Sequence, residues 1–196
     1  MTESLPKVKA IVFDCFGVLV SDSWLPFRKK HFSDDIEKFT KATFLRKQAD
    51  GNKITRDEFY EQVSSMAGMT AEEMNKEIDS RSNFVNQEML EYISELKKDY
   101  KIGFLSNASQ NWLGNFFTPA QEALFDKVSI SCETGYVKPD PMAYQSIADM
   151  LDLPIKECLL IDDQPTYCEG AKELGMQVIN YKDLDTLKDE LAKRLN

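Results

Sequence analysis

The sequence of 196 residues has little histidine and little cysteine. Its single histidine, His31, cannot build a catalytic triad alone, and its charged neighbours predict a place at the surface. The four cysteines, Cys15, Cys132, Cys158 and Cys168, show no Cys-x-x-Cys spacing, so they do not suggest a zinc site. Most lie in or beside apolar segments, which favours reduced, buried thiols and a cytoplasmic location.

Long apolar runs and positive charge are also scarce. The apolar stretch at residues 10–20 is interrupted by Asp14 and is too short to span a bilayer, and no targeting segment is recognisable. The chain has 24 Lys and Arg against 33 Asp and Glu, a formal net charge of −9. This charge repels nucleic acid and anionic membranes, so we expect neither as a partner. An anionic substrate would need local positive charge.

What is present predicts a folded α/β protein. Hydrophobic residues make up 42% of the chain and aromatic residues 11%, enough for a globular core. An apolar strand pattern lies before residue 19, and amphipathic helix patterns alternate with further apolar strand patterns after residue 85. This alternation predicts a doubly wound, Rossmann-like parallel sheet built from residues 1–19 and 85–196. No internal repeat or low-complexity segment interrupts it.

Residues 20–84 have a different pattern and predict a small helical cap domain. This segment is polar and helix-like, and Thr55 and Thr70 each begin a capping box. A helix is expected over residues 34–48, with an inner face formed by Ile36, Phe39, Thr40 and Phe44. Because the segment starts directly after the first strand, we expect it to cover the end of that strand.

Polar side chains collect where the expected strands end. Asp14, Ser106 and the pair Asp162-Asp163 each follow an apolar strand, and Lys138 lies in the turn before a helix. The carboxyl ends of parallel strands lie along one edge of a sheet. Three carboxylates there would repel one another unless a cation lay between them, and an oxygen site with few protein ligands suits Mg²⁺. Lys138 adds a positive charge for an anionic substrate, and Ser106 adds a hydroxyl donor.

Each of these residues also has a simpler explanation when it is considered alone. An acidic pair before a helix is a common N-terminal cap. Ser106 before Asn107 is typical of a turn, and a lysine before a proline is usually a solvated surface residue. Their joint occurrence, each at the end of an element, favours one shared site.

Four motifs in this order resemble the haloacid dehalogenase superfamily, whose members are mostly phosphatases. They are FDCFGVL at residues 13–19, LSN at 105–107, GYVKP at 135–139 and IDDQ at 161–164. The resemblance covers the whole chain, and residues 20–84 match the position of that family's helical cap. The set of four is specific, whereas any one motif alone would be weak.

The resemblance implies a mechanism and a set of site residues. Asp14 would be the nucleophile and would form an aspartyl-phosphate that water then hydrolyses. Mg²⁺ would be held by Asp14, the backbone carbonyl of Phe16, and Asp163, with Asp162 assisting. The phosphoryl oxygens would be bound by Ser106, Asn107 and Lys138. The expected substrate is a small phosphate ester.

One position departs from the family pattern. Phosphatases of the family carry a second Asp two residues after the nucleophile as general acid, and here that position is Phe16. General acid–base catalysis is typically worth about 10²–10⁴-fold in rate.

Three interpretations follow. The favoured one is a Mg²⁺-dependent phosphatase that uses water or a cap residue such as Asp22 as acid. The second is a catalytically weak binding or regulatory protein. The third is a 2-haloacid dehalogenase, with Arg28 or Arg46 as the carboxylate clamp, although dehalogenases need no metal and generally lack the acidic pair. The individual substrate and the oligomeric state have no recognisable signal.

Overall fold

A computed structural model describes residues 6–79 and 84–195 of the chain. Its centre is a five-stranded parallel sheet with the strand order β3-β2-β1-β4-β5. The strands are β1 (Ala10–Phe13), β2 (Lys101–Ser106), β3 (Lys127–Ile130), β4 (Cys158–Asp162) and β5 (Gln177–Asn180). The predicted α/β, doubly wound fold class is therefore confirmed.

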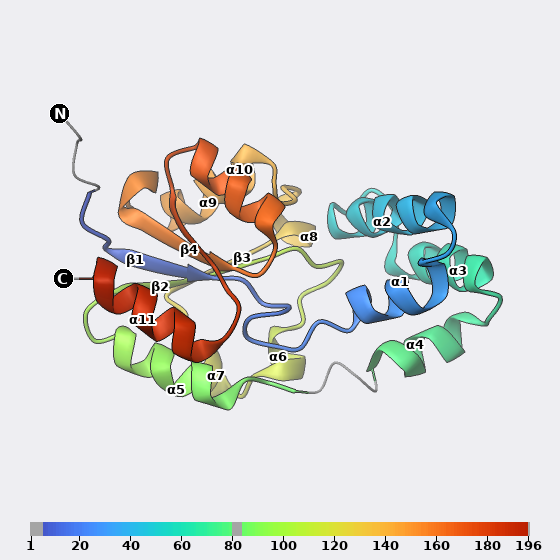
Figure 1. Cartoon of the computed structure of the whole chain (residues 1–196), viewed down its shortest axis with the longest axis horizontal. Coiled ribbons are helices and arrows are strands. Elements are labelled where there is room, and N and C mark those ends of the chain that lie inside the picture. Colours follow the sequence, from blue (N-terminus) through green and yellow to red (C-terminus); the bar gives the residue numbers. More distant parts are fainter. Residues whose placement is uncertain (1–5, 80–83, 196) are drawn as a thin grey trace.

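Helices cover both faces of this sheet, and together they form the sheet core (Figure 1). One face carries α5 (Gln87–Leu96) and α11 (Leu184–Arg194), and the other carries α9 (Pro141–Met150) and α10 (Pro165–Glu173). The shorter helices are α6 (Leu113–Phe116), α7 (Pro119–Glu122), α8 (Ser131–Thr134) and the 3-10 helix η1 (Ile155–Glu157). None of the described helices is long and apolar enough to cross a membrane.

The central strand β1 explains the layered arrangement. All four of its residues are buried, and they alternate between two hydrophobic clusters, with Ile11 and Phe13 on one face and Ala10 and Val12 on the other. A strand that is apolar on both faces is stable only with helices on both sides. Its register sets Phe13 between Phe104 of β2 and Ile161 of β4. The next residue, Asp14, therefore lies between the ends of two neighbouring strands.

A separate group of helices, here called the helical unit, lies beside the sheet core on the right of Figure 1. It consists of α1 (Trp24–Phe32), α2 (Ile36–Asp50), α3 (Arg56–Ala67) and α4 (Ala71–Asp79), which share their own hydrophobic cluster. Both predicted capping boxes are present. Thr55 Oγ1 accepts from the Glu58 N–H at 3.1 Å, and Thr70 Oγ1 accepts from the Glu73 N–H at 3.2 Å.

The chain enters and leaves the helical unit along two adjacent segments. Val20 forms an antiparallel bridge with Val85, and the Ser21 N–H donates to the Phe84 carbonyl at 3.1 Å. Of the predicted cap segment at residues 20–84, residues 80–83 lie outside the described residues. The paired segments hold the two ends of the unit together against the sheet core.

The predicted inner face of α2 is wrong at Ile36, Thr40 and Phe44, which are exposed, whereas Phe39 packs against the cluster of the unit. Ile36 is 78% exposed and Phe44 58% exposed, whereas the buried residues of the helix include Ala42, Leu45 and Ala49. Two of these three are alanines, because α2 packs closely against its neighbours. The largest apolar side chains of this helix therefore do not mark its buried side.

The predicted surface position of His31 is also wrong. Its side chain is 16% exposed, and its ring centroid lies 4.5 Å from that of Phe27. Its Nε2 lies 3.0 Å from Glu77 Oε2, so α1 and α4 are linked through this pair. The neighbouring Lys30 donates to the other oxygen of Glu77, at 2.9 Å, so a charged neighbour in the sequence does not place this histidine on the open surface.

The corrected face of α2 has a measurable consequence. We expect Leu45→Ala to lower the free energy of unfolding by about 2–5 kcal/mol, because it leaves a cavity inside the helical unit. Phe44→Ala, one residue away on the exposed side, should change it by less than about 0.5 kcal/mol. Urea unfolding of both variants measures this, and a larger loss for Phe44→Ala would contradict the observed packing.

Candidate active site

A buried lysine joins three strands at the carboxyl edge of the sheet. The side chain of Lys138 is 0% exposed. Its Nζ donates to Asp14 Oδ1 at 2.7 Å, to Asp162 Oδ2 at 2.6 Å and to the Leu105 carbonyl at 3.2 Å. These acceptors come from the ends of β1, β4 and β2. Lys138 is therefore no surface lysine, and all three of its N–H groups are used inside the protein.

The charges at this edge shift one another's pKa. Burial alone would lower the pKa of Lys138, but the charges of Asp14 and Asp162 more than reverse this and raise it, so the ammonium persists. Burial raises the pKa of Asp14, and the nearby Lys138 only partly offsets that rise. Burial and the charge of Asp162 raise the pKa of Asp163 to about 6. The site therefore carries more buried negative charge than one lysine compensates.

The three aspartates have the arrangement of a cation site. Asp14, Asp162 and Asp163 each offer an oxygen, and these oxygens lie within 4.8 Å of one another. Among the described residues, Asp163 Oδ1 is buried without a hydrogen-bond partner, while its Oδ2 accepts from Gln164 Nε2 at 2.6 Å. A buried carboxylate oxygen without a donor suits a hard cation such as Mg²⁺. The residues present therefore fit the predicted magnesium site.

Asp162 has a different environment from the other two aspartates. It is 0% exposed, its Oδ2 accepts from Lys138, and its Oδ1 accepts from the Gln164 N–H at 2.9 Å. Both oxygens are thus already engaged within the protein. This arrangement favours Asp162 as the residue that positions Lys138 rather than as a direct metal ligand.

Gly17 allows the turn after β1 to approach Asp163. Its φ is +95°, and a Cβ at this position would lie 2.6 Å from the Asp163 carboxylate. Only glycine fits both requirements, because another residue would be strained in φ and would also collide with the acid. The turn that begins with Asp14 and Phe16 is therefore held directly beside the acid of β4.

Asn107 holds the backbone of Lys138. Its Oδ1 accepts from the Lys138 N–H at 2.8 Å, and its Nδ2 donates to the Lys138 carbonyl at 3.0 Å. The peptide bond that follows, Lys138-Pro139, is cis. Both ends of the carboxamide are therefore used to position Lys138, which leaves its predicted phosphate contact as a prediction.

Ser106 ends β2 beside the nucleophile position. It is 2% exposed, and within the described chain its Oγ has no hydrogen-bond partner, although the Cys15 thiol lies close to it. Ser106 and Cys15 line a small apolar pocket, whereas Asp14 and Asn107 line the main cleft next to it. The predicted contact of Ser106 with a phosphate therefore stays a prediction.

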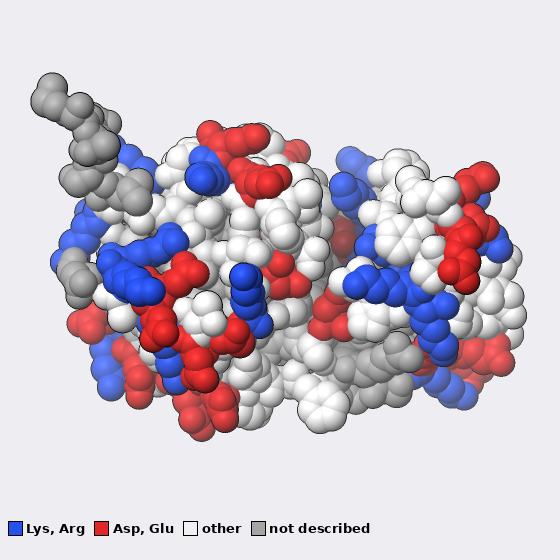
Figure 2. Space-filling model, viewed as in Figure 1, with Lys and Arg blue, Asp and Glu red and all other residues white. Residues whose placement is uncertain are grey.

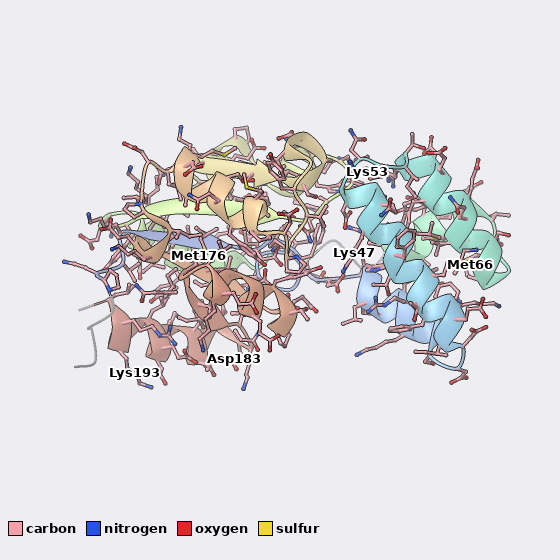
Figure 3. The ribbon with its side chains drawn as sticks, turned by 90° about the horizontal axis from the view of Figure 1, so that it is seen from above. Lys47, Lys53, Met66, Met176, Asp183 and Lys193 are labelled. Atoms are coloured by element: carbon pink, nitrogen blue, oxygen red, sulfur yellow. The ribbon has the colours of Figure 1, made fainter. Side chains whose placement is uncertain are left out.

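The main cleft, about 640 Å³, lies between the sheet core and the helical unit. The surface in Figure 2 is indented between these two parts. The cleft residues of the sheet core include Asp14, Phe16, Asn107, Trp112, Phe116, Gln164 and Tyr167, and those of the helical unit include Asp22, Arg28, Thr43, Arg46, Lys47, Asp50, Arg56 and Tyr60. Lys47, labelled in Figure 3, extends from α2 on the side that faces the sheet core. The active-site edge is therefore covered by the helical unit.

Phe16 belongs to an aromatic wall of this cleft. Its ring packs edge-on against Phe116 at 6.0 Å between centroids, and Phe116 lies 6.0 Å from Trp112. The side chain that replaces the family's general acid is therefore packed into apolar surroundings and cannot transfer a proton.

Sequence reasoning missed Tyr167, which lies at the N-terminal end of α10. Its ring centroid lies 5.1 Å from Lys138 Nζ, and burial raises its pKa, so the phenol stays neutral. No periodicity or spacing distinguishes this tyrosine from the other tyrosines of the chain. Only the close approach of α10 to Lys138 brings it into the cleft.

Comparison with known proteins identifies the family. A family model described as haloacid dehalogenase-like hydrolase matches residues 8–175. The protein belongs to this family. The hydrolase is 28% identical to D-ribitol-5-phosphate phosphatase of Bacteroides thetaiotaomicron, over 96% of this chain and 99% of that protein. It is 26% identical to a phosphatase of Mycobacterium tuberculosis, over 87% of this chain and 86% of that protein.

Solved structures show the same relationship. A HAD family enzyme from Bacteroides thetaiotaomicron matches the hydrolase with a TM-score of 0.73 at 24% identity, over 93% of this chain and 99% of that one. That enzyme in complex with magnesium and inorganic phosphate matches with a TM-score of 0.70 at 25% identity, over 92% and 98%. A 2-haloacid dehalogenase from Pseudomonas syringae shares the fold at a TM-score of 0.59 and 16% identity, over 95% and 99%. The predicted family is confirmed, and the predicted Mg²⁺ cofactor is supported.

The buried ion cluster predicts a pH-dependent loss of stability. Lys138→Met should lower the free energy of unfolding by about 3–5 kcal/mol without divalent metal, because Asp14 and Asp162 lose their buried counter-charge. The pKa of Asp14 should rise further above its unfolded value. Its protonation then relieves the penalty as the pH falls, so the loss should be larger at pH 8 than at pH 5.

The matched control is Lys97→Met, which removes an ion pair to Asp126 whose side chains are 31% and 37% exposed. This surface substitution should cost less than about 1 kcal/mol. Denaturant unfolding at the two pH values, in the presence of a chelator, measures both variants. Equal losses for Lys138→Met and Lys97→Met would contradict the central role of Lys138.

Proposed function

We propose that this hydrolase is a Mg²⁺-dependent phosphatase that acts on small phosphomonoesters. The observation that carries the proposal is the fixed position of Asp14 in the cleft, 2.7 Å from Lys138 Nζ and next to the unpartnered oxygen of Asp163. Both curated relatives described above are phosphatases. A cleft of about 640 Å³ suits a small organic ester.

In the proposed reaction, the Asp14 carboxylate attacks the phosphorus atom and the bond between phosphorus and the ester oxygen breaks. That oxygen takes a proton from water, or from a cap residue such as Asp22, and leaves as an alcohol. The resulting aspartyl-phosphate is then hydrolysed by water, which releases inorganic phosphate and restores the carboxylate. Lys138 orients Asp14 and keeps positive charge beside the reacting group, and Asp162 and Asn107 hold Lys138 in place. Ser106 donates its free hydroxyl to a phosphoryl oxygen.

Asp14, Asp163 and the Phe16 carbonyl would hold Mg²⁺, which would supply positive charge beside the phosphoryl group. Phe16 can serve in this set because any residue supplies a backbone carbonyl. The Oδ1 of Asp163, which has no hydrogen-bond partner, would then have the cation as its partner.

We further infer that the helical unit works as a cap over the site, as the helical pattern of residues 20–84 predicts. The cleft is lined by residues from both the unit and the sheet core. A lid that closes over a substrate excludes water from the reaction, and its hinges are a few residues at the ends of elements. The paired segments at Ser21 and Phe84 have this position.

Phe16 favours one alternative, a catalytically weak protein that binds phosphate esters. The dehalogenase interpretation has less support. Of the two arginines that could clamp a substrate carboxylate, Arg46 is engaged with Asp50 at 2.9 and 3.0 Å. A group of three aspartates that fits a metal also has no role in metal-independent dehalogenation.

The metal assignment can be tested by stability. We expect Mg²⁺ to raise the melting temperature, because it binds the folded protein only, with a gain of about 2.7 kcal/mol at 100 times the dissociation constant. Asp163→Asn should abolish most of this shift, while Asp34→Asn on the exposed surface of the helical unit should not. Calorimetric melting with and without MgCl₂ measures the shift, and equal shifts in the two variants would refute the assignment.

The role of Phe16 can be tested with phosphate esters that differ in their leaving group. Without a general acid, p-nitrophenyl phosphate, whose leaving oxygen needs little protonation, should be hydrolysed far better than an alkyl phosphate. Phe16→Asp should raise alkyl phosphate hydrolysis by up to about 10²–10⁴-fold. Steady-state release of phosphate in the presence of Mg²⁺ measures both activities.

The control for this test is Phe16→Asn, which is similar in size and polarity but cannot transfer the proton. Similar rates for Phe16→Asp and Phe16→Asn would mean that another group supplies the proton. Asp22 is the next residue to test, since it lines the cleft and its Oδ1 accepts from the Trp24 N–H at 2.8 Å.

A further inference from the structure

Unpartnered buried atoms concentrate around the cleft. In the part of the chain that the structure describes, the buried side-chain nitrogen and oxygen atoms without a hydrogen-bond partner belong to Arg28, Arg56, Ser106, Glu157 and Asp163. Glu157 forms an ion pair with Lys9 at 2.9 Å, away from the cleft. Ser106 and Asp163 belong to the phosphate and metal positions. The remaining two atoms are both arginine Nε groups, and both arginines line the cleft from the helical unit.

Arg28 is held in place without a counter-charge. Its guanidinium lies 4.2 Å from the ring centroid of Phe39, and its Nη1 donates to Thr43 Oγ1. It forms no ion pair with a carboxylate of residues 6–79 or 84–195, although Asp22 and Tyr167 act on it electrostatically. Burial lowers its pKa from the ordinary value, as expected for a cation that lacks a direct anionic partner.

Arg56 lies at another position on the cleft wall and also forms no ion pair among the described residues. Its guanidinium lies 4.5 Å from the ring centroid of Tyr60 and 5.3 Å from that of Trp112 in the sheet core. Its Nη2 donates to the neutral Asn75 Oδ1 at 2.7 Å. The aromatic contacts fix the side chain but leave its positive charge without an anion among the described residues.

A third arginine of the same cleft shows the opposite situation. Arg46 Nε donates to both carboxylate oxygens of Asp50, at 2.9 and 3.0 Å. Burial alone would lower the pKa of Arg46, but the charge of Asp50 more than reverses this and raises it. The protein therefore neutralises one cleft arginine with its own carboxylate and leaves two others free. This is unexpected in a chain with a net charge of −9.

The visible surface charges do not separate into a basic and an acidic region. On the face shown in Figure 2, basic and acidic side chains are interspersed over both the sheet core and the helical unit. Asp22 also lines the cleft and acts on Arg28 electrostatically, but among the described residues it forms no ion pair with either arginine, and its carboxylate accepts from the N–H groups of Trp24 and Leu25. The Nε atoms of Arg28 and Arg56 are themselves buried, but both side chains line the cleft, so their guanidinium groups are what a bound anion would contact.

We propose that Arg28 and Arg56 form a subsite that selects phosphomonoesters whose leaving group carries a second anionic group, a carboxylate or a second phosphate. This inference rests on the proposed phosphatase function and names its substrate class. A hydroxyl of a neutral polyol would satisfy a free N–H but not the positive charge. Charge-assisted hydrogen bonds are roughly twice as strong as neutral ones, and guanidinium matches carboxylate and phosphate geometry.

Matched pairs of esters test the proposal. A carboxylate is added between glycerol 3-phosphate and 3-phosphoglycerate, and between ribitol 5-phosphate and 5-phosphoribonate. A second phosphate is added between fructose 6-phosphate and fructose 1,6-bisphosphate. We expect the anionic member of at least one pair to show a kcat/KM about tenfold or more above its neutral partner, which corresponds to one charge-assisted contact. The pairs in which the anionic member is preferred show whether the subsite binds a carboxylate or a phosphate. They also show how far from the phosphate ester the second anionic group must lie.

Two variants assign this preference to the arginines. Arg28→Gln or Arg56→Gln should bring the ratio of anionic to neutral kcat/KM close to one, while Lys53→Gln, which removes an exposed charge of the helical unit away from the cleft lining, should keep the ratio. Melting temperatures identify a variant that does not fold. If one arginine variant does not fold, the kcat/KM ratio of the other arginine variant tests the proposal. A preference that survives in both arginine variants would overturn the proposal, as would neutral members that match or exceed the anionic ones in every pair.

A binding measurement separates this proposal from the phosphatase function. Absence of phosphate release from every ester would refute the phosphatase function itself. Calorimetry with Asp14→Asn protein, Mg²⁺ and the same pairs then still tests the subsite. We expect the anionic member of a pair to bind about tenfold more tightly and this difference to be lost when Arg28→Gln or Arg56→Gln is added. Equal affinities within all pairs would refute the subsite.

Discussion

The structure depends on one buried ion cluster at the carboxyl edge of the sheet. Lys138 binds Asp14 and Asp162 and the carbonyl of Leu105, so its position connects the ends of three strands. A buried charge is tolerated only when it is paired and hydrogen-bonded. The surrounding features serve this requirement, since Asn107 holds the Lys138 backbone and Gly17 lets the first turn reach Asp163.

The same requirement explains how the site fits its proposed chemistry. Three carboxylates share the edge, but one ammonium compensates only part of their charge, and Asp163 retains an oxygen without a donor. A divalent cation would offset the excess negative charge of the carboxylates, and a phosphoryl group would bind beside that cation. In the proposed function, the sheet core binds the phosphoryl group and the helical unit selects the substrate.

The helical unit contributes a different chemistry from the sheet core. Its cleft wall is rich in arginine, and its arginines stack on aromatic rings, including Trp112 across the cleft. On the opposite wall, Phe16 and Phe116 form an apolar surface. The proposed substrate therefore meets a polar, charged site for its phosphate and a cationic, aromatic site for the rest.

The sequence by itself determined the alternation of strands and helices, because buried parallel strands require long apolar runs such as β1. It also determined which residues gather at one edge, since Asp14, Ser106 and Asp162 all end parallel strands. Only the tertiary structure decided their partners. It engaged both oxygens of Asp162 and left Asp163 Oδ1 free, it brought Tyr167 beside Lys138, and it turned Ile36 and Phe44 outward. These outcomes depend on contacts between elements distant in the chain, which local periodicity and spacing do not encode.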